Sequence, residues 1–291
     1  MKIILSRKGF DSGSGGVPSP IFPDGSMLSL PIPDEDSPTR YRDLLWQGRP
    51  VVGAIVEALT NGRITAAAGA HIDPDLDRSA LTRERGWRPL LGQTGAAQGH
   101  LQNQGVRSGD VFVFFGLFQN VRKHGGVLRV LRDSTPQHVI FGWLQVGEVL
   151  FVDRCSQNSL KWAAYHPHTN REPDAQNTLY VACDHLQLPG RRGLKVPGAG
   201  VFSRYDPALR LTAPESAKPS LWLLPDWFHP KGRDSSLSYH GDTSRWTTAD
   251  EAVLLQAVAR GQEFILDCDD YPESADWLAE LVVRSQASDC T

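Results

Sequence analysis

Two long apolar runs in the middle of the chain predict the central strands of a β-sheet. Residues 109–116 read Gly-Asp-Val-Phe-Val-Phe-Phe-Gly, and residues 138–149 are similarly rich in β-branched and aromatic side chains. Such side chains fit a pleated surface, and the bounding glycines mark the ends of the runs. Residues 2–6 and 262–267 are shorter runs of the same kind and predict two further strands.

The N-terminal quarter of the chain alternates less regularly. Ser37-Pro38 favours the start of a helix leading into residues 41–46, because serine caps helices and proline suits the first turn. An apolar run at 51–59 ends at Asn61-Gly62. Residues 63–71 are then expected to form a buried strand or an extended segment.

The C-terminal part carries signals of both helices and strands. Thr248 and Glu251 form a capping box, which predicts a helix to about Arg260. Residues 274–285 have the spacing of an amphipathic helix. Since no internal repeat or long linker is visible, we expect one α+β unit over residues 1–291. Its helices would flank a mixed sheet or a barrel.

The two central runs resemble part of a known small barrel. A Gly-Asp pair before an apolar strand, followed by an apolar strand interrupted by glycine, is similar to the PUA-like group, which includes ASCH and EVE domains. The resemblance covers residues 109–149. It implies a barrel core that binds RNA or a modified base.

The composition is that of an ordinary globular protein without a membrane partner. Of 291 residues, 40% are hydrophobic and 22% are charged, as is typical of soluble proteins. The apolar run within residues 1–8 is too short for a signal peptide, and no stretch approaches the roughly 18 apolar residues of a membrane helix. We therefore expect a soluble, cytoplasmic protein.

Net charge and cysteine content narrow the chemistry. A net charge of −3 excludes a protein that coats nucleic acid by charge alone, but it allows an enzyme that admits one nucleotide into a pocket. The cysteines are widely spaced and form no CxxC pair, so a disulfide scaffold is not expected. A metal site should therefore use histidines and carboxylates, which suit iron, manganese or catalytic zinc.

His71 and Asp73 are the clearest candidates for metal ligands. Residues two apart on extended backbone point to the same side, so this imidazole and carboxylate can bind one ion. With a second histidine they make the minimum donor set of a non-haem iron site. The alternative is a chance pair in a turn, since Asp73 precedes Pro74. Asp75 and Asp77 are expected to solvate the same loop.

The missing ligand is expected from one of four other histidines. In His166-Pro167-His168 the proline favours extended backbone at His166, so both imidazoles can share a side, although a rigid surface loop is the alternative. His100 precedes the first central strand, and His240 lies in a polar loop. More than three ligands would allow two metal ions. The remaining histidines are expected at the surface or hydrogen-bonded in the core: His124, His138, His185 and His229.

Three features are candidates for contact with a nucleotide. The glycine-rich residues 9–16 could hold a phosphate, although the spacing of known phosphate loops is missing and a surface or lid loop is the alternative. Arg191 and Arg192 lie in a glycine-flanked loop, where they could contact phosphates or simply be solvated. Trp227 could stack on a base or pack in the core.

Several stretches together resemble the third family of nucleotide modification associated domains. They span nearly the whole chain: residues 6–11, 15–21, 29–33, 71–75, 109–116, 166–168, 198–202 and 262–264. The resemblance implies one full-length domain and a role in the metabolism of hypermodified bases. The polar positions of the family match Asp11, His71, Asp73, His100, His166, His168 and His240 here.

One function is preferred and two are alternatives. We expect a metal-dependent enzyme, with a mononuclear or dinuclear non-haem iron centre, that oxidises a nucleobase or nucleotide. His71 and Asp73 would be ligands, and Asp11 would be a further ligand or a general base. A zinc- or manganese-dependent hydrolase is the enzymatic alternative. The other alternative is a PUA-like binding module, whose histidines are structural or read a modified base.

Overall fold

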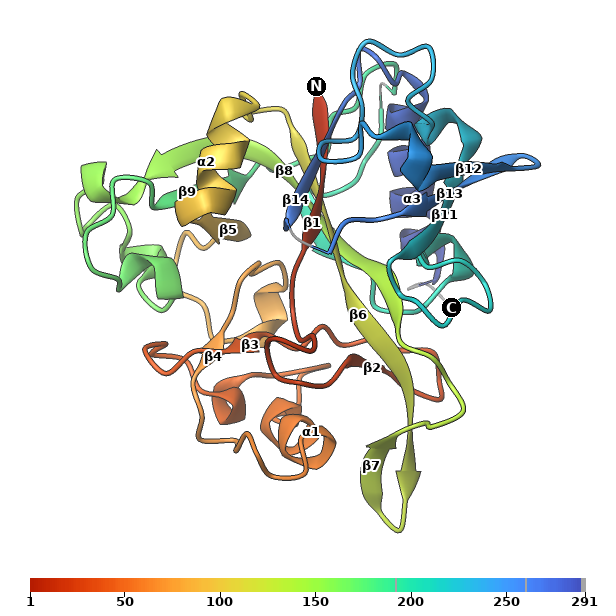
Figure 1. The fold of residues 1–291 in the computed structure, drawn as a ribbon. Helices are drawn as coiled ribbons and strands as arrows, with labels where there is room; N and C mark the ends of the chain where they lie inside the picture. The colour runs from red at the N-terminus through yellow and green to blue at the C-terminus, as the bar shows by residue number, and fades with distance from the viewer. Residues whose placement is uncertain (192, 260, 289–291) are drawn as a thin grey trace.

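The computed structural model describes residues 1–191, 193–259 and 261–288, and their fold is α+β, as expected (Figure 1). Within these residues a mixed sheet of nine strands forms the centre. Its main path runs in the order β14 (Glu263–Asp267), β1 (Lys2–Arg7), β6 (Val111–His124), β8 (Gln137–Phe151), β9 (Thr178–Ala182) and β5 (Leu90–Gln93). The other three strands are β2 (Ser19–Ile21) and β7 (Val127–Val130), which pair with β6, and β10 (Ala199–Val201), which pairs with β8.

The two predicted central runs are confirmed as β6 and β8. They pair antiparallel from Val111 opposite Gln145 to Phe118 opposite Gln137, and β1 lies parallel to β6 on its other side. From Val111 to Gly116 the side chains of β6 are buried on both faces of the sheet, which explains why this part of its sequence is continuously apolar rather than alternating. The strands predicted at both ends of the chain and the last helix, α3 (Glu273–Ser288), are also confirmed.

The sheet does not close into the barrel that the PUA-like resemblance implied. β14 and β5 stand at the two ends of the strand path, and no pairing joins them in the part of the chain that the structure describes. A closed barrel needs its first and last strands to pair. Here β6 instead extends over 14 residues and ends in a hairpin with β7. The mixed sheet was therefore the correct alternative.

The helix predicted to begin at Thr248 is wrong. β12 (Trp246–Ala249) and β13 (Ala252–Gln256) form a hairpin there, and β11 (Leu221–Pro225) completes a separate three-stranded sheet. Asp250, in the connecting turn, has a left-handed φ of 47°. The supposed capping box therefore lies across a tight turn. Burial alternates along β13 with the period of a strand.

Short elements build the N-terminal quarter. Ser37 does not cap a helix, because its hydroxyl donates to the carbonyl of Ala70 at 2.7 Å. The extended segment narrows to β4 (Ala70–His71), which pairs with β3 (Ile32–Pro33). Two α-helices belong to this first part of the chain. α1 (Val52–Leu59) precedes β4, and α2 (Gly95–Asn103) follows β5. The 3-10 helices are Tyr41–Asp43, Arg78–Ala80, Val152–Arg154, Lys161–Ala163, Pro167–Thr169, Pro207–Leu209, Asp226–Phe228 and Thr243–Arg245.

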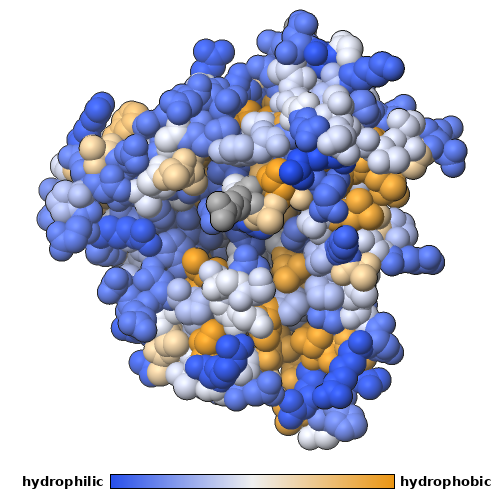
Figure 2. Space-filling model, viewed as in Figure 1, coloured by the Kyte–Doolittle hydropathy of each residue, from blue (hydrophilic) through white to orange (hydrophobic). Residues whose placement is uncertain are grey.

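These elements bring the segment after β4 close to the main sheet. Figure 1 places β3 and β4 between α1 on one side and the group of β5 and α2 on the other. The face seen in Figure 2 is mostly hydrophilic, with separate hydrophobic patches near its centre, on its right side and in its lower half. None of the described helices is both long and apolar enough to cross a membrane.

Candidate metal centre

Three imidazoles converge on one buried carboxylate just after β4. The side chain of Asp73 is 5% exposed. Its Oδ1 accepts the backbone N–H of Gly92 at 2.8 Å and lies 3.5 Å from Nε2 of His166. Its Oδ2 lies 3.8 Å from Nε2 of His71 and 3.7 Å from Nε2 of His168. One carboxylate oxygen is thus held by the protein, and the other faces two imidazoles.

Strand pairing sets the orientation of His71. β3 and β4 place Ile32 opposite His71, and Asp34 follows directly after β3. The Nδ1–H of His71 donates to Oδ2 of Asp34 at 2.6 Å. The lone pair of the neutral ring is therefore on Nε2, which faces Asp73. A carboxylate behind a metal-binding imidazole is the usual way in which proteins fix the tautomer of such a ligand.

His168 is fixed from two sides. The amide of Asn177 donates to the carbonyl of His168 at 2.7 Å, which leaves its oxygen to accept Nδ1–H of the same histidine at 2.8 Å. This pair of bonds again puts the lone pair on Nε2. On the other side, a Cβ at Gly92 would lie 2.3 Å from Cδ2 of His168, so only glycine lets the ring pack against β5.

His166 has a different role from His168. Its Nδ1 accepts the backbone N–H of His168 at 3.4 Å, so the proton of the neutral ring is on Nε2. That Nε2 is buried without a hydrogen-bond partner among the described residues, and it faces the oxygen of Asp73 that Gly92 also holds. The geometry therefore makes His166 a group that positions Asp73. The donor atoms of His71, Asp73 and His168 all lie within 4.8 Å of one another.

The electrostatics of this cluster favour a cation. Burial tends to lower the pKa of His71, but the carboxylates of Asp73 and Asp34 outweigh it and raise that pKa. Burial also opposes ionisation of Asp73, yet the histidines around it hold its pKa well below the ordinary value. Burial lowers the pKa of His168 to about 4. Two imidazole lone pairs and a carboxylate repel one another unless a proton or a metal ion lies between them. Two histidines and one carboxylate form the facial donor set of non-haem iron sites.

A buried ion pair anchors the segment that follows the cluster. Asp75 was expected to solvate its loop, but its side chain is 1% exposed. Both oxygens bind the guanidinium of Arg83, at 2.6 and 2.7 Å, and Asp75 also accepts from the hydroxyl of Tyr165. Because Tyr165 directly precedes His166, this network connects the two segments that carry the imidazoles. The network therefore holds these two segments in a fixed position relative to each other.

The cluster lies on the wall of a cavity of about 440 Å³. Three cationic side chains line the same cavity: Arg7, Lys8 and Arg171. The ammonium of Lys8 binds Glu263 at 2.9 Å, and the guanidinium of Arg171 lies 3.7 Å from Asp34.

The N-terminus of α2 also meets this cavity, because Thr94 and Ala97 line it. The hydroxyl of Thr94 donates to Asp174 instead of capping the helix, and the first turn has no acidic residue. This wall therefore suits an anion.

The other predicted residues lie in varied surroundings. Asp11 lines the cavity, and its Oδ1 accepts two backbone N–H groups of the glycine-rich loop. His100, on α2, contacts the hydroxyl of Ser238 at 3.1 Å and lies outside the cluster. Both ring nitrogens of His240 are hydrogen-bonded, to the carbonyl of Ser238 and to the N–H of Val258.

Of the other residues predicted to contact substrate, neither Arg191 nor Trp227 lines the cavity, whereas Gly9, Asp11 and Ser14 of the glycine-rich loop do. Arg191 binds Asp276 of α3 at 2.7 Å, and Arg192 lies outside the described residues. Trp227 stacks on Phe228 with ring centroids 4.0 Å apart. The partners that orient the cluster were not found from the sequence. Asp34 directly follows a stretch of the family resemblance, whereas Asn177 and Gly92 carry no such signal.

Comparison with known proteins gives one match. The model of the family described as nucleotide modification associated domain 3 matches residues 2–267. No curated protein and no solved structure matches the chain. The matched range includes every member of the His/Asp cluster and all the cationic residues of its cavity.

Proposed function

Since the chain belongs to the family of nucleotide modification associated domain 3, we propose that it is a metal-dependent enzyme that modifies a nucleobase or a nucleotide. The observation that carries the proposal is the convergence of two imidazole Nε2 atoms on one buried carboxylate oxygen, at 3.7 and 3.8 Å. Each imidazole is held by an outer partner in the tautomer that metal binding needs.

His71, Asp73 and His168 would hold the metal. Iron is the preferred ion, because a facial set of two histidines and one carboxylate leaves positions for substrate and oxygen. Manganese or zinc with the same donors would instead support hydrolysis. One ion fits better than two, since His166 uses its Nδ1 for a backbone N–H and faces the oxygen of Asp73 already bound by Gly92.

The cavity wall supports an anionic substrate such as a nucleotide. Lys8 and Arg171 lie on this wall with the N-terminus of α2, and all three favour a phosphate. The net charge of −3 makes one bound nucleotide more fitting than a long stretch of nucleic acid. Asp11, on the same wall, is the proposed general base.

Elemental analysis tests the proposal directly. We expect protein made without a His tag and loaded anaerobically with iron(II) to hold about one ion per chain. His71→Ala and His168→Ala should lose the ion, whereas His124→Ala, on an exposed part of β6, should keep it. Metal-free wild-type protein after loading would remove the basis of the enzyme. Tight binding of modified DNA by that metal-free protein would favour the binding module instead.

A further inference from the structure

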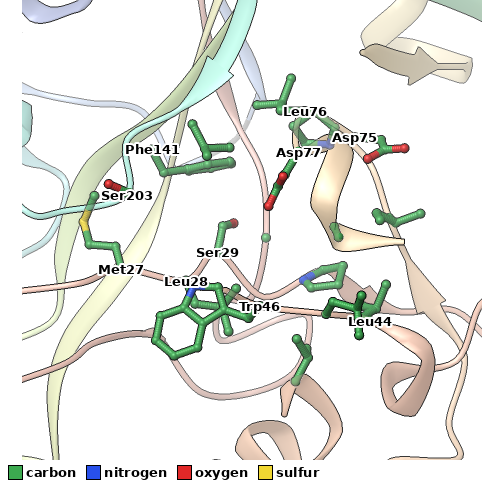
Figure 3. Close-up of a pocket in the computed structure, with 18 of the residues that line it drawn as sticks. Met27, Leu28, Ser29, Leu44, Trp46, Asp75, Leu76, Asp77, Phe141 and Ser203 are labelled. Carbon is green, nitrogen blue, oxygen red and sulfur yellow. The ribbon is translucent and has the colours of Figure 1, made fainter. Parts of the chain in front are cut away.

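A second cavity is lined by the segment that carries Asp73, from Ile72 to Asp77. It has a volume of about 200 Å³, and Figure 3 shows its lining side chains. Most of the lining is apolar, including Met27, Leu28, Leu44, Ile72, Leu76 and Phe202. A concave apolar site with few polar groups is the usual form of a small-molecule pocket.

Two aromatic rings face this pocket. In Figure 3, Phe141 lies on one side of Ser29 and Trp46 lies on the other. The second face of Trp46 is covered by Phe22, whose ring stacks on it with centroids 4.6 Å apart. The pocket therefore has aromatic walls against which a flat ring can stack.

The backbone holds Trp46 firmly in place. Trp46 and Arg49 exchange two hydrogen bonds, at 2.9 and 3.0 Å, across the loop Gln47-Gly48. Both loop residues have left-handed φ values, 51° and 72°, as a two-residue hairpin turn requires. Because Trp46 is fixed from its backbone and from its outer face, a ring that binds there meets a preorganised surface.

The charges of the pocket select against phosphate. Among the described residues that line it, none is Lys or Arg, whereas Asp73, Asp75 and Asp77 all contribute. Asp75 is neutralised by Arg83, and the side chain of Asp77 points towards the pocket in Figure 3. Carboxylate oxygens accept hydrogen bonds, so they favour a ring whose edge carries N–H donors.

The volume of the pocket is enough for a single ring system but not for a whole nucleotide. Pockets that bury drug-sized ligands measure roughly 300–1,000 Å³. A volume of about 200 Å³ suits one heteroaromatic ring system without its sugar and phosphate. Gly9 and Asp73 line both this pocket and the larger cavity that holds Arg7, Lys8 and Arg171. A ring in the pocket thus lies next to Asp73.

We propose that the pocket between Trp46 and Phe141 binds the uncharged ring of a nucleobase. The phosphate-bearing end of the nucleotide then remains for the larger cavity, whose wall includes Arg171 and the N-terminus of α2. The identity of the ring as a nucleobase rests on the proposed function, while the binding of an N–H-bearing ring rests on the pocket alone. Asp73, which lines both cavities, would then lie beside the bound substrate.

Calorimetry with metal-free protein tests this ring site. The probes are the four deoxynucleosides, with 2-deoxyribose 5-phosphate as the probe that lacks a base. We expect at least one nucleoside to bind, and Trp46→Ala to weaken it about ten- to hundredfold, the range of base stacking on an aromatic side chain. Trp162→Ala, a matched change at a half-buried tryptophan outside both cavities, should leave the affinity unchanged.

Two further variants keep the test decisive if Trp46→Ala does not fold. Trp46→Phe keeps an aromatic ring and should retain most of the affinity. Leu28→Trp fills the pocket and should abolish nucleoside binding while the melting temperature stays high. No nucleoside binding by folded wild type, or equal binding by Leu28→Trp, would overturn the ring site.

The same experiment separates this proposal from the metal-dependent enzyme. His168→Ala should lose metal but still bind the nucleoside, because His168 does not line the apolar pocket. Nucleoside binding through Trp46 by a protein that never holds metal would support the ring site and overturn the metal centre. One bound metal ion with no nucleoside binding would do the reverse.

Discussion

Buried histidines occur in two regions of this molecule and have opposite surroundings. Around Asp73, the side chains of His71 and His168 each use one ring nitrogen for an outer partner and direct the other to a shared carboxylate. Around Trp222 and Phe264, His240 uses both nitrogens for backbone groups, and His138 accepts from the indole of Trp222 at 2.9 Å.

The difference shows that burial alone does not identify a functional histidine. His168 and His240 are both almost inaccessible, and burial lowers the pKa of each to about 4. The two residues differ in whether a ring nitrogen remains without a hydrogen bond. His240 has none left for a metal, whereas the free Nε2 of His168 meets a second imidazole and a carboxylate within 4.8 Å.

The largest effect is expected at Asp73, the residue on which the first region depends. Asp73→Asn keeps the size of the side chain but removes the charge that balances a metal ion. We expect iron content after anaerobic loading to fall from about one ion per chain to the background level of the apoprotein. The control is Asp77→Asn, an acidic residue of the same loop outside the cluster. Equal metal in both variants would place the ion elsewhere.

Alanine substitutions of one histidine in each region should affect different properties, metal affinity in the first region and stability in the second. His168→Ala is expected to reduce metal affinity more than about hundredfold, beyond the usual effect of losing an outer partner. His240→Ala should leave metal affinity intact but destabilise the fold by about 2–4 kcal/mol, since it leaves buried backbone groups unpaired and opens a cavity. Metal titration and urea unfolding measure the two effects. A His240→Ala protein that loses metal would remove the distinction.

The fold was readable from the sequence where burial dictates the residue types. The buried apolar runs Val111–Gly116 of β6 and Val139–Leu144 of β8 were predicted because strands covered on both faces need such residues. The hairpin of β12 and β13 was missed because Thr248 and Glu251 match a capping box, and only the left-handed φ of Asp250 shows the turn. Whether the sheet closes depends on which distant strands pair, and the apolar runs do not predict that pairing.

The candidate site was readable only in part. His71 and Asp73 stand at a spacing that local geometry alone makes suggestive, and His168 was among the possible partners. The separate roles of His166 and His168 depend on Asn177 and on the missing side chain of Gly92, both far from the other ligands in sequence. His240 resembled a ligand because the sequence does not show that both of its nitrogens are occupied.

The second region should also govern part of the acid stability of the metal-free protein. Burial lowers the pKa of both His138 and His240 to about 4, and nearby arginines add to the effect. The unfolded chain takes up protons from about pH 6.5 while these folded histidines do not, so stability falls as the pH drops from 6.5 to 4. Each contributes up to about 3 kcal/mol of this loss.

Urea unfolding at several pH values measures this contribution. His240→Asn removes one titrating group, so the slope of the unfolding free energy against pH should decrease by about one proton between pH 4 and 6.5. His124→Asn, at an exposed position, is the matched control. Parallel slopes for wild type and His240→Asn would mean that His240 also takes up its proton in the folded protein.

A smaller effect is expected from the outer partner of His168. Asn177→Ala removes the amide that fixes the tautomer of this ligand but leaves all three donor atoms in place. Loss of such a partner typically costs about 10- to 100-fold in metal affinity. Asn158→Ala, at an exposed position in the loop before the segment that carries His166, should change nothing. Competition with a chelator at fixed pH measures both, and an unchanged affinity for Asn177→Ala would show that His168 orients itself through Gly92 and its backbone.

The smallest effect concerns the two exposed arginines that the structure places differently. Arg171 lies on the cavity wall, whereas Arg191 binds Asp276 of α3 away from both cavities. Both side chains are well solvated, so Arg171→Ala should weaken binding of a nucleoside monophosphate only about two- to fivefold. Arg191→Ala should not change it, because no phosphate in the cavity can reach that loop's ion pair. Calorimetry at two salt concentrations separates them, since only the Arg171 effect should shrink as salt rises. A loss with Arg191→Ala as large as that with Arg171→Ala would move the phosphate out of the cavity and onto the loop.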